Sequence, residues 1–240
     1  MRASHADVVG SLLRPPELLE AQRRLAAGTL TPEEFKAIED RAVDDAIALQ
    51  ERVGLEIVTD GEMRRQSFQS QMTAAVSGFG EHDLDAFLWG DWYDEAGVQK
   101  KRRPRRLGAV GQLKRHRYLS ADEFSYLKAR TSRIAKITLP SPGLWANFWS
   151  PRHSRAAYPT LESLLTDIVH ILREEVEELI RRGARYIQID APHYGLLLDS
   201  RTRAFYERLG WSLDRWLSLG VDLDNALMTG FPDVTFGFHV

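Results

Sequence analysis

Residues 160–192, TLESLLTDIVHILREEVEELIRRGARYIQIDAP, contain the pattern that decides the fold. Within Leu161–Leu179, leucine, isoleucine and valine recur at helical spacing, and Gly183 is a typical helix-ending residue. The short apolar run Tyr186–Ile189 follows directly and is typical of a buried strand. The stretch therefore predicts a helix that leads into a strand covered on both faces, which is the repeating unit of a parallel α/β sheet.

The same alternation of helix and strand patterns extends along the rest of the chain. A second helix is predicted from Thr31 to Val53, with Thr31 as the N-cap, Pro32 in the first turn and Glu34 completing a capping box. Five apolar runs predict strands: ADVVGSL (6–12), LEIVTDGE (55–62), AKITLPSP (135–142), RYIQIDAP (185–192) and VTFGFHV (234–240). Such alternation predicts a parallel sheet wrapped by helices.

The region between the second and third predicted strands follows no clear pattern, and we expect an irregular insertion around residues 80–130. The run LGAVGQLK (107–114) within it is ambiguous. The run KKRRPRR (Lys100–Arg106) is almost entirely basic and is interrupted by Pro104. It fits a solvated loop or hairpin, or a patch for an anionic ligand or nucleic acid, and one short run supports the second interpretation only weakly.

Composition excludes several classes of protein. A formal net charge of −2 argues against a general binder of nucleic acid or of membrane surfaces. No apolar run reaches the ~18 residues of a membrane span, and the start lacks the apolar core of a secretory signal, so we expect a cytoplasmic protein. The absence of cysteine excludes disulfides and thiolate metal ligands within these residues.

Polar residues follow the predicted strands at the points where the strands end. These are Ser11, Asp60, Glu62, Asp190 and His239. Singly, each has an ordinary interpretation as a helix cap, a turn residue or a hydrogen-bonded core histidine. Because the carboxyl ends of parallel strands meet at one face, their convergence favours a functional site there. His193, three residues after Asp190, is a further candidate for that face.

Five motifs, taken in order, resemble the catalytic barrel of cobalamin-independent methionine synthase, in its shorter single-barrel relatives. They are HADVVGSLLRPPELLEA, GLEIVTDGEMRR, KITLPSPG, RYIQIDAP and DVTFGFHV. The resemblance implies that residues 1–240 form a partial (β/α)8 TIM-type barrel, with about five of the eight strands present.

The resemblance also implies an S-methyltransferase that moves a methyl group from 5-methyltetrahydrofolate or another donor to the thiol of homocysteine. Zinc would bind that thiol and hold it as the thiolate. By motif match, Glu62 and Asp190 would hold the substrate ammonium group, Ser11 would help to hold its carboxylate, and His239 would be a zinc ligand. No catalytic residue beyond that ligand can be assigned within the chain.

Two departures from the family pattern limit this interpretation. The family binds zinc with a histidine, two cysteines and a glutamate; His239 and Val240 match only the first two positions of its His-x-Cys pair. We therefore expect the segment alone to be inactive and metal-free, and its open barrel edges to favour self-association or pairing with a complementing chain. Ala191 stands where the longer enzymes have a second carboxylate, which leaves the methyl donor open.

Three alternatives remain open. The chain could be a non-catalytic remnant or pseudoenzyme that binds an amino acid or a complementing chain. It could be a related decarboxylase or thiol-alkyl transferase barrel, although the carboxylates of TDGE and QIDAP suit an amino-acid substrate better. A nucleic-acid module built on KKRRPRR is the weakest alternative, because the chain as a whole carries no basic excess.

Overall fold

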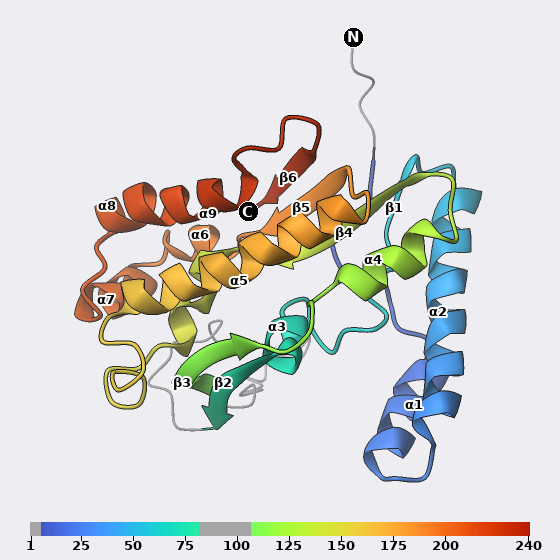
Figure 1. Cartoon of the computed structure of the whole chain (residues 1–240), viewed down its shortest axis with the longest axis horizontal. Helices are drawn as coiled ribbons and strands as arrows, with labels where there is room; N and C mark the ends of the chain where they lie inside the picture. Colours follow the sequence, from blue (N-terminus) through green and yellow to red (C-terminus); the bar gives the residue numbers. More distant parts are fainter. Residues whose placement is uncertain (1–5, 82–106) are drawn as a thin grey trace, which may run out of the picture.

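The computed structural model describes residues 6–81 and 107–240. Its centre is a parallel sheet in the order β1-β4-β5-β6 (Figure 1). The strands are β1 (Ile57–Val58), β4 (Ile134–Pro140), β5 (Tyr186–Asp190) and β6 (Thr235–His239). The register places Thr138 beside Gln188, and Asp190 beside both Pro140 and His239. The α/β class predicted from the sequence is thus confirmed.

Helices surround this sheet, and a separate antiparallel hairpin lies beside it (Figure 1). The α-helices are α1 (Pro16–Ala26), α2 (Pro32–Arg52), α3 (Ser70–Ala75), α4 (Ala121–Lys128), α5 (Leu161–Arg181), α6 (His193–Leu196), α7 (Ser200–Arg208), α8 (Leu213–Arg215) and α9 (Val221–Met228). A 3-10 helix, η1 (Pro142–Phe148), follows β4, and a π-helix, η2 (Trp216–Gly220), joins α8 to α9. The hairpin pairs β2 (Val76–Glu81) with β3 (Leu107–Arg115).

The two predicted long helices form as their local signals indicate. Thr31 and Glu34 make the reciprocal bonds of a capping box at the start of α2. Thr160 caps α5 through its hydroxyl. The apolar side of α5 packs into the main core, which also contains Ile187 and Ile189 of β5. Burial of this stripe, more than helix propensity, holds α5 on the sheet.

The two faces of the sheet differ in character. Alternate residues of a strand point to opposite faces, so Ile137 and Leu139 of β4 lie on the face that joins the main hydrophobic core. Lys136 and Thr138 lie on the other face, and both are buried. Polar side chains therefore line one buried face of the sheet, and they are the groups from which the candidate site is built.

The predicted strand at residues 6–12 does not form, and this part of the prediction is wrong. The segment has no backbone ladder; instead the Lys136 ammonium binds Asp7 at 2.9 Å and the Gln188 amide donates to the Val9 carbonyl at 2.7 Å. One backbone bond, from Leu12 to the Gly61 carbonyl, ties its end to the turn after β1. Side chains hold this segment, so an apolar run alone misidentified it.

Of the stretch expected to be irregular around residues 80–130, residues 82–106 lie outside the described residues, and residues 107–130 contain regular structure. The ambiguous run 107–114 lies in β3, and α4 follows at Ala121–Lys128. The basic run Lys100–Arg106 lies outside the described residues. Within residues 6–81 and 107–240, no helix is both long and apolar enough to cross a membrane.

Candidate functional site

Asp190 and His239 lie side by side at the carboxyl end of the sheet. They are the last residues of β5 and β6, and the His239 Nδ1 is 3.3 Å from the Asp190 Oδ1. The Gln188 amide, two residues earlier on the same face of β5, donates to that oxygen at 2.6 Å. Asp190 is buried, whereas the His239 side chain is 46% exposed. The imidazole can therefore still reach a ligand from solvent.

Glu62 enters the site through a tight turn directly after β1. The Asp60 carboxylate accepts a bond from the Glu62 backbone N–H at 2.9 Å, as in an Asx turn. Glu62 has φ +55°, among the described residues the only positive φ outside glycine. Glutamate adopts this conformation rarely, and residues held in it cluster at functional sites. The Asp-Gly-Glu motif thus encodes a strained turn that directs one carboxylate inward.

Three side chains hold the Glu62 carboxylate. Ser11 donates to Oε2 at 2.5 Å, and Thr138 of β4 donates to Oε1 at 2.7 Å. Arg65 Nη1 lies 3.4 Å from the same Oε1. Since Ser11 gives its only hydroxyl hydrogen to Glu62, its proposed bond to a substrate carboxylate would have to come from another of its groups.

Glu62 and Asp190 lie near enough for their charges to interact. Burial raises the pKa of Asp190, and the negative charge of Glu62 raises it further, while the Gln188 amide and His239 oppose the rise. A cation placed between two such carboxylates would be bound by both. The structure thus brings together Ser11, Glu62, Asp190 and His239 from the amino-terminal segment and three strand ends.

A second layer of buried charge lies behind Glu62. The Arg65 guanidinium donates to Glu123 of α4 at 2.9 and 3.0 Å and is 1% exposed. Burial raises the pKa of Glu123 to about 7, with Arg65 opposing and Asp60 adding to the rise. Burial by itself would lower the pKa of Arg65. The negative charges around it raise that pKa instead, and the charge of Glu123 contributes most to the rise.

Sequence reasoning assigned no role in the site to Arg65, Thr138 or Glu123. Arg65 stands three positions after Glu62 in the motif GEMRR, so attention to the neighbours of Glu62 could have found it. Thr138 stands in the motif KITLPSP, but no local signal links it to Glu62. Glu123 carries no such signal, because it belongs to an ordinary amphipathic helix.

His193 does not join the site. It is 1% exposed, packs against Tyr194 and Trp216, and neither ring nitrogen has a hydrogen-bond partner among the described residues. Burial lowers its pKa to about 3, so the ring is neutral at physiological pH. It is a core aromatic residue, and the prediction that it lies with Asp190 at the face formed by the carboxyl ends of the strands is not supported.

His239 is the only predicted zinc ligand, and its surroundings do not make a complete zinc site. Catalytic zinc takes about three protein ligands. In the part of the chain that the structure describes, no three His, Cys, Asp or Glu side chains are grouped so as to hold a metal ion. The residues present therefore do not fit the ion by themselves.

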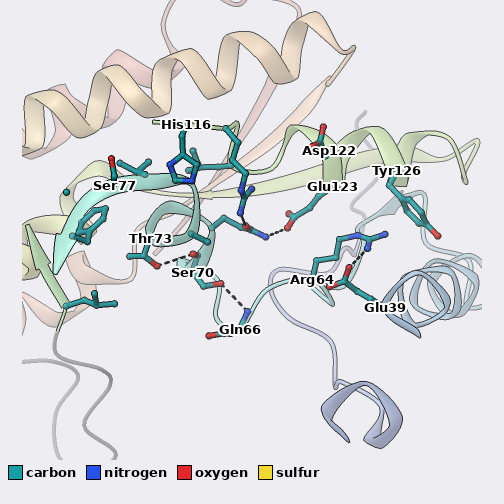
Figure 2. A pocket seen from close by; sticks show the side chains of 18 of the residues that line it. Glu39, Arg64, Gln66, Ser70, Thr73, Ser77, His116, Asp122, Glu123 and Tyr126 are labelled. Carbon is teal, nitrogen blue, oxygen red and sulfur yellow. Dashed lines mark hydrogen bonds and ion pairs between the residues drawn. The ribbon is translucent and has the colours of Figure 1, made fainter. Parts of the chain in front are cut away.

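A cleft of about 850 Å³ lies beside the site, between α2, the α3 region, the hairpin and α4 (Figure 2). Arg64 on its wall pairs with Glu39 and Asp40 of α2 and covers the Tyr126 ring. Glu123 also lines the cleft, where the Gln71 amide donates to it. Glu123, which belongs to the buried layer of charge behind Glu62, therefore forms part of the cleft wall, whereas Glu62 does not line the cleft.

The parallel sheet, its helical crossovers and the carboxylates at its carboxyl edge define a domain of the (β/α)-barrel type. Within that class, the chain belongs to the family of the cobalamin-independent synthase catalytic domain, whose model matches residues 5–221.

Individual relatives are similar to this chain over most of its length. The chain is 30% identical over 188 residues to the methionine synthase of Pyrococcus furiosus, covering 78% of this chain and 51% of that protein. It is 25% identical over 240 residues to the uncharacterized protein YxjH of Bacillus subtilis, covering 98% of this chain and 60% of that protein. The chain thus spans little more than half the length of these relatives.

A solved structure confirms the fold. The putative vitamin-B12 independent methionine synthase from Listeria monocytogenes superposes with a TM-score of 0.72. The match covers 99% of this chain and 65% of that one, at 20% sequence identity. The barrel-type architecture expected from the resemblance is therefore shown.

Proposed function

We propose that this chain forms the amino-acid-binding part of an S-methyltransferase that methylates the thiol of homocysteine. One observation carries the proposal: Glu62 and Asp190, from separate strand ends, present two buried, interacting carboxylates at the carboxyl end of the sheet. Two carboxylates with little solvent suit a primary ammonium group, which has three donors and one positive charge. Membership of a synthase family, with a relative named methionine synthase, supports a homocysteine acceptor, because methionine is S-methylated homocysteine.

The residues of this chain would bind and orient the acceptor. Glu62, held by Ser11 and Thr138, and Asp190, held by Gln188, would fix the ammonium group from two sides. Positioning of this kind lowers the barrier to transfer by pre-organising the acceptor. His239 would be one zinc ligand, as the family resemblance implies. The methyl donor would be 5-methyltetrahydrofolate or another methylated compound.

Binding and transfer are tested separately. Isothermal titration of the chain with L-methionine should show binding that Glu62→Gln and Asp190→Asn each weaken about tenfold or more, since each removes a charge-assisted bond. The natural gene product that contains these residues should convert homocysteine to methionine with 5-methyltetrahydrofolate, and His239→Ala should lower both its zinc content and its turnover. Amino-acid binding without any methyl transfer would favour the non-catalytic alternative. Failure of the wild-type chain to bind would refute the proposal.

A further inference from the structure

Arg65 lies directly behind the Glu62 carboxylate and cannot move freely. Its Nε and Nη2 donate to Glu123, and Nη2 also donates to the Ser120 hydroxyl at 3.1 Å and the Thr138 carbonyl at 3.0 Å. Its Nη1 donates to the Thr138 hydroxyl at 2.8 Å. A planar guanidinium held along both edges keeps one orientation. The positive charge beside Glu62 is therefore fixed in place.

Thr138 links the fixed orientation of the Arg65 guanidinium to the Glu62 carboxylate. Its hydroxyl has one hydrogen, and it accepts the bond from Arg65 with a lone pair. The hydrogen is consequently directed at Glu62 Oε1, 2.7 Å away. Arg65 thus acts on Glu62 both through its own charge and through the direction of the threonine hydroxyl.

The Glu62 carboxylate has little acceptor capacity left. An ionised carboxylate offers about four lone-pair directions. Thr138 and Arg65 occupy two on Oε1, and Ser11 occupies one on Oε2. About one direction, on Oε2, remains for a ligand, so a rotation of this carboxylate would misdirect the position that a substrate could use.

We infer that Arg65 and Thr138 are positioning residues that hold the Glu62 carboxylate in the one orientation that receives the ammonium group of an amino-acid substrate. The inference rests on the proposed function. A purely structural role, in which Arg65 only neutralises the buried acids Glu62 and Glu123, predicts a different result. If that were its role, replacing Arg65 would lower the affinity for every ligand alike, because the site would loosen as a whole. If Arg65 positions Glu62, replacing it would lower the affinity only for ligands that carry the ammonium group.

Two titration ligands separate these roles: L-methionine, and desamino-methionine, which lacks only the ammonium group. Thr138→Val is nearly isosteric and removes the hydroxyl, while Arg65→Lys keeps the charge but loses the planar fork. We expect each to weaken binding of L-methionine roughly tenfold and to leave desamino-methionine within about twofold. Arg64→Met is the matched control, because the neighbouring arginine pairs with α2 and does not touch Glu62. It should change neither affinity.

The outcomes are distinguishable. Equal weakening of both ligands, or no weakening of either, by Thr138→Val would overturn the positioning role while the proposed function stands, provided that Glu62→Gln still weakens L-methionine. If Glu62→Gln leaves L-methionine binding unchanged, the proposed function fails, and this inference fails with it. Circular dichroism and thermal melts verify that each variant is folded; should Arg65→Lys not fold, Thr138→Val decides alone.

Discussion

Replacing Lys136 by methionine should reveal how much of the molecule one buried ammonium holds together. Lys136 is 0% exposed, binds the Asp7 carboxylate at 2.9 Å and donates to the Gln188 side-chain oxygen at 2.8 Å. Methionine keeps the apolar length of the side chain and removes the charge. The variant therefore tests the polar contacts without opening a large cavity.

The magnitude follows from burial. Removing one member of a fully buried ion pair costs about 3–5 kcal/mol. The Asp7 side chain is 17% exposed and can be partly hydrated in the variant, so we expect a smaller loss, about 2–3 kcal/mol. For a chain of this length that corresponds to a fall in Tm of about 5–10 °C. Lys136→Met/Asp7→Asn should recover about 1 kcal/mol or more, since it no longer leaves a carboxylate unpaired.

Urea unfolding followed by circular dichroism measures these values. Lys36→Met is the control, because Lys36 pairs with Asp40 at the surface with its side chain 57% exposed, and its loss should cost under about 0.5 kcal/mol. A Lys136→Met variant as stable as this control would refute the idea that the ammonium holds the amino-terminal segment. The same variant should weaken L-methionine binding, since Gln188 could then turn its amide away from Asp190.

Three further predictions concern single features. Thr31→Ala should destabilise the chain by about 1 kcal/mol in urea unfolding, because it removes the hydroxyl of the α2 capping box; an unchanged midpoint would contradict that role. Gly61→Ala should destabilise by roughly 1–2 kcal/mol and weaken L-methionine binding, since Gly61 has φ +67° and an added Cβ would meet three side-chain atoms at 3.2 Å. Because Glu123 has its pKa raised from 4.5 to about 7, the native state binds the extra proton, and stability should fall as pH rises through that interval. Glu123→Gln should flatten this fall in urea unfolding measured at several pH values, and an equal slope in both proteins would assign the effect to other groups.

Local signals made much of the fold predictable. Both long helices carry their caps and apolar spacing within one short stretch, so α2 and α5 needed no distant information. The strands β4, β5 and β6 were recognisable as short apolar runs, one before α5 and two after it. Residues 6–12 show the same apolar character, yet their partners are side chains on β4 and β5, far away in the sequence. An apolar run in the sequence does not show whether a neighbouring strand is available to form backbone hydrogen bonds with it.

The candidate site was predictable where it follows the strand ends. Glu62, Asp190 and His239 each come directly after or at the end of an apolar run, and parallel topology brings them together. The long-range supporting contacts were not predictable, because Arg65 meets Glu123 across 58 positions and Thr138 across 73. Nothing in the spacing of a single sequence encodes which buried arginine faces which acid.

One strand, β4, carries side chains that hold both carboxylates of the candidate site, Glu62 directly and Asp190 through Gln188. Lys136 and Thr138 are two residues apart and so share a face of β4. Thr138 donates to Glu62, while Lys136 fixes Gln188, whose amide donates to Asp190. Lysine offers only donors, so the Gln188 oxygen must face Lys136 and its nitrogen must face Asp190. A shift of β4 by one residue would turn both supports to the opposite face and leave both carboxylates without them. The register of β4 therefore determines the geometry of the whole candidate site, so the proposed amino-acid binding should depend on this strand more than on the loops around it.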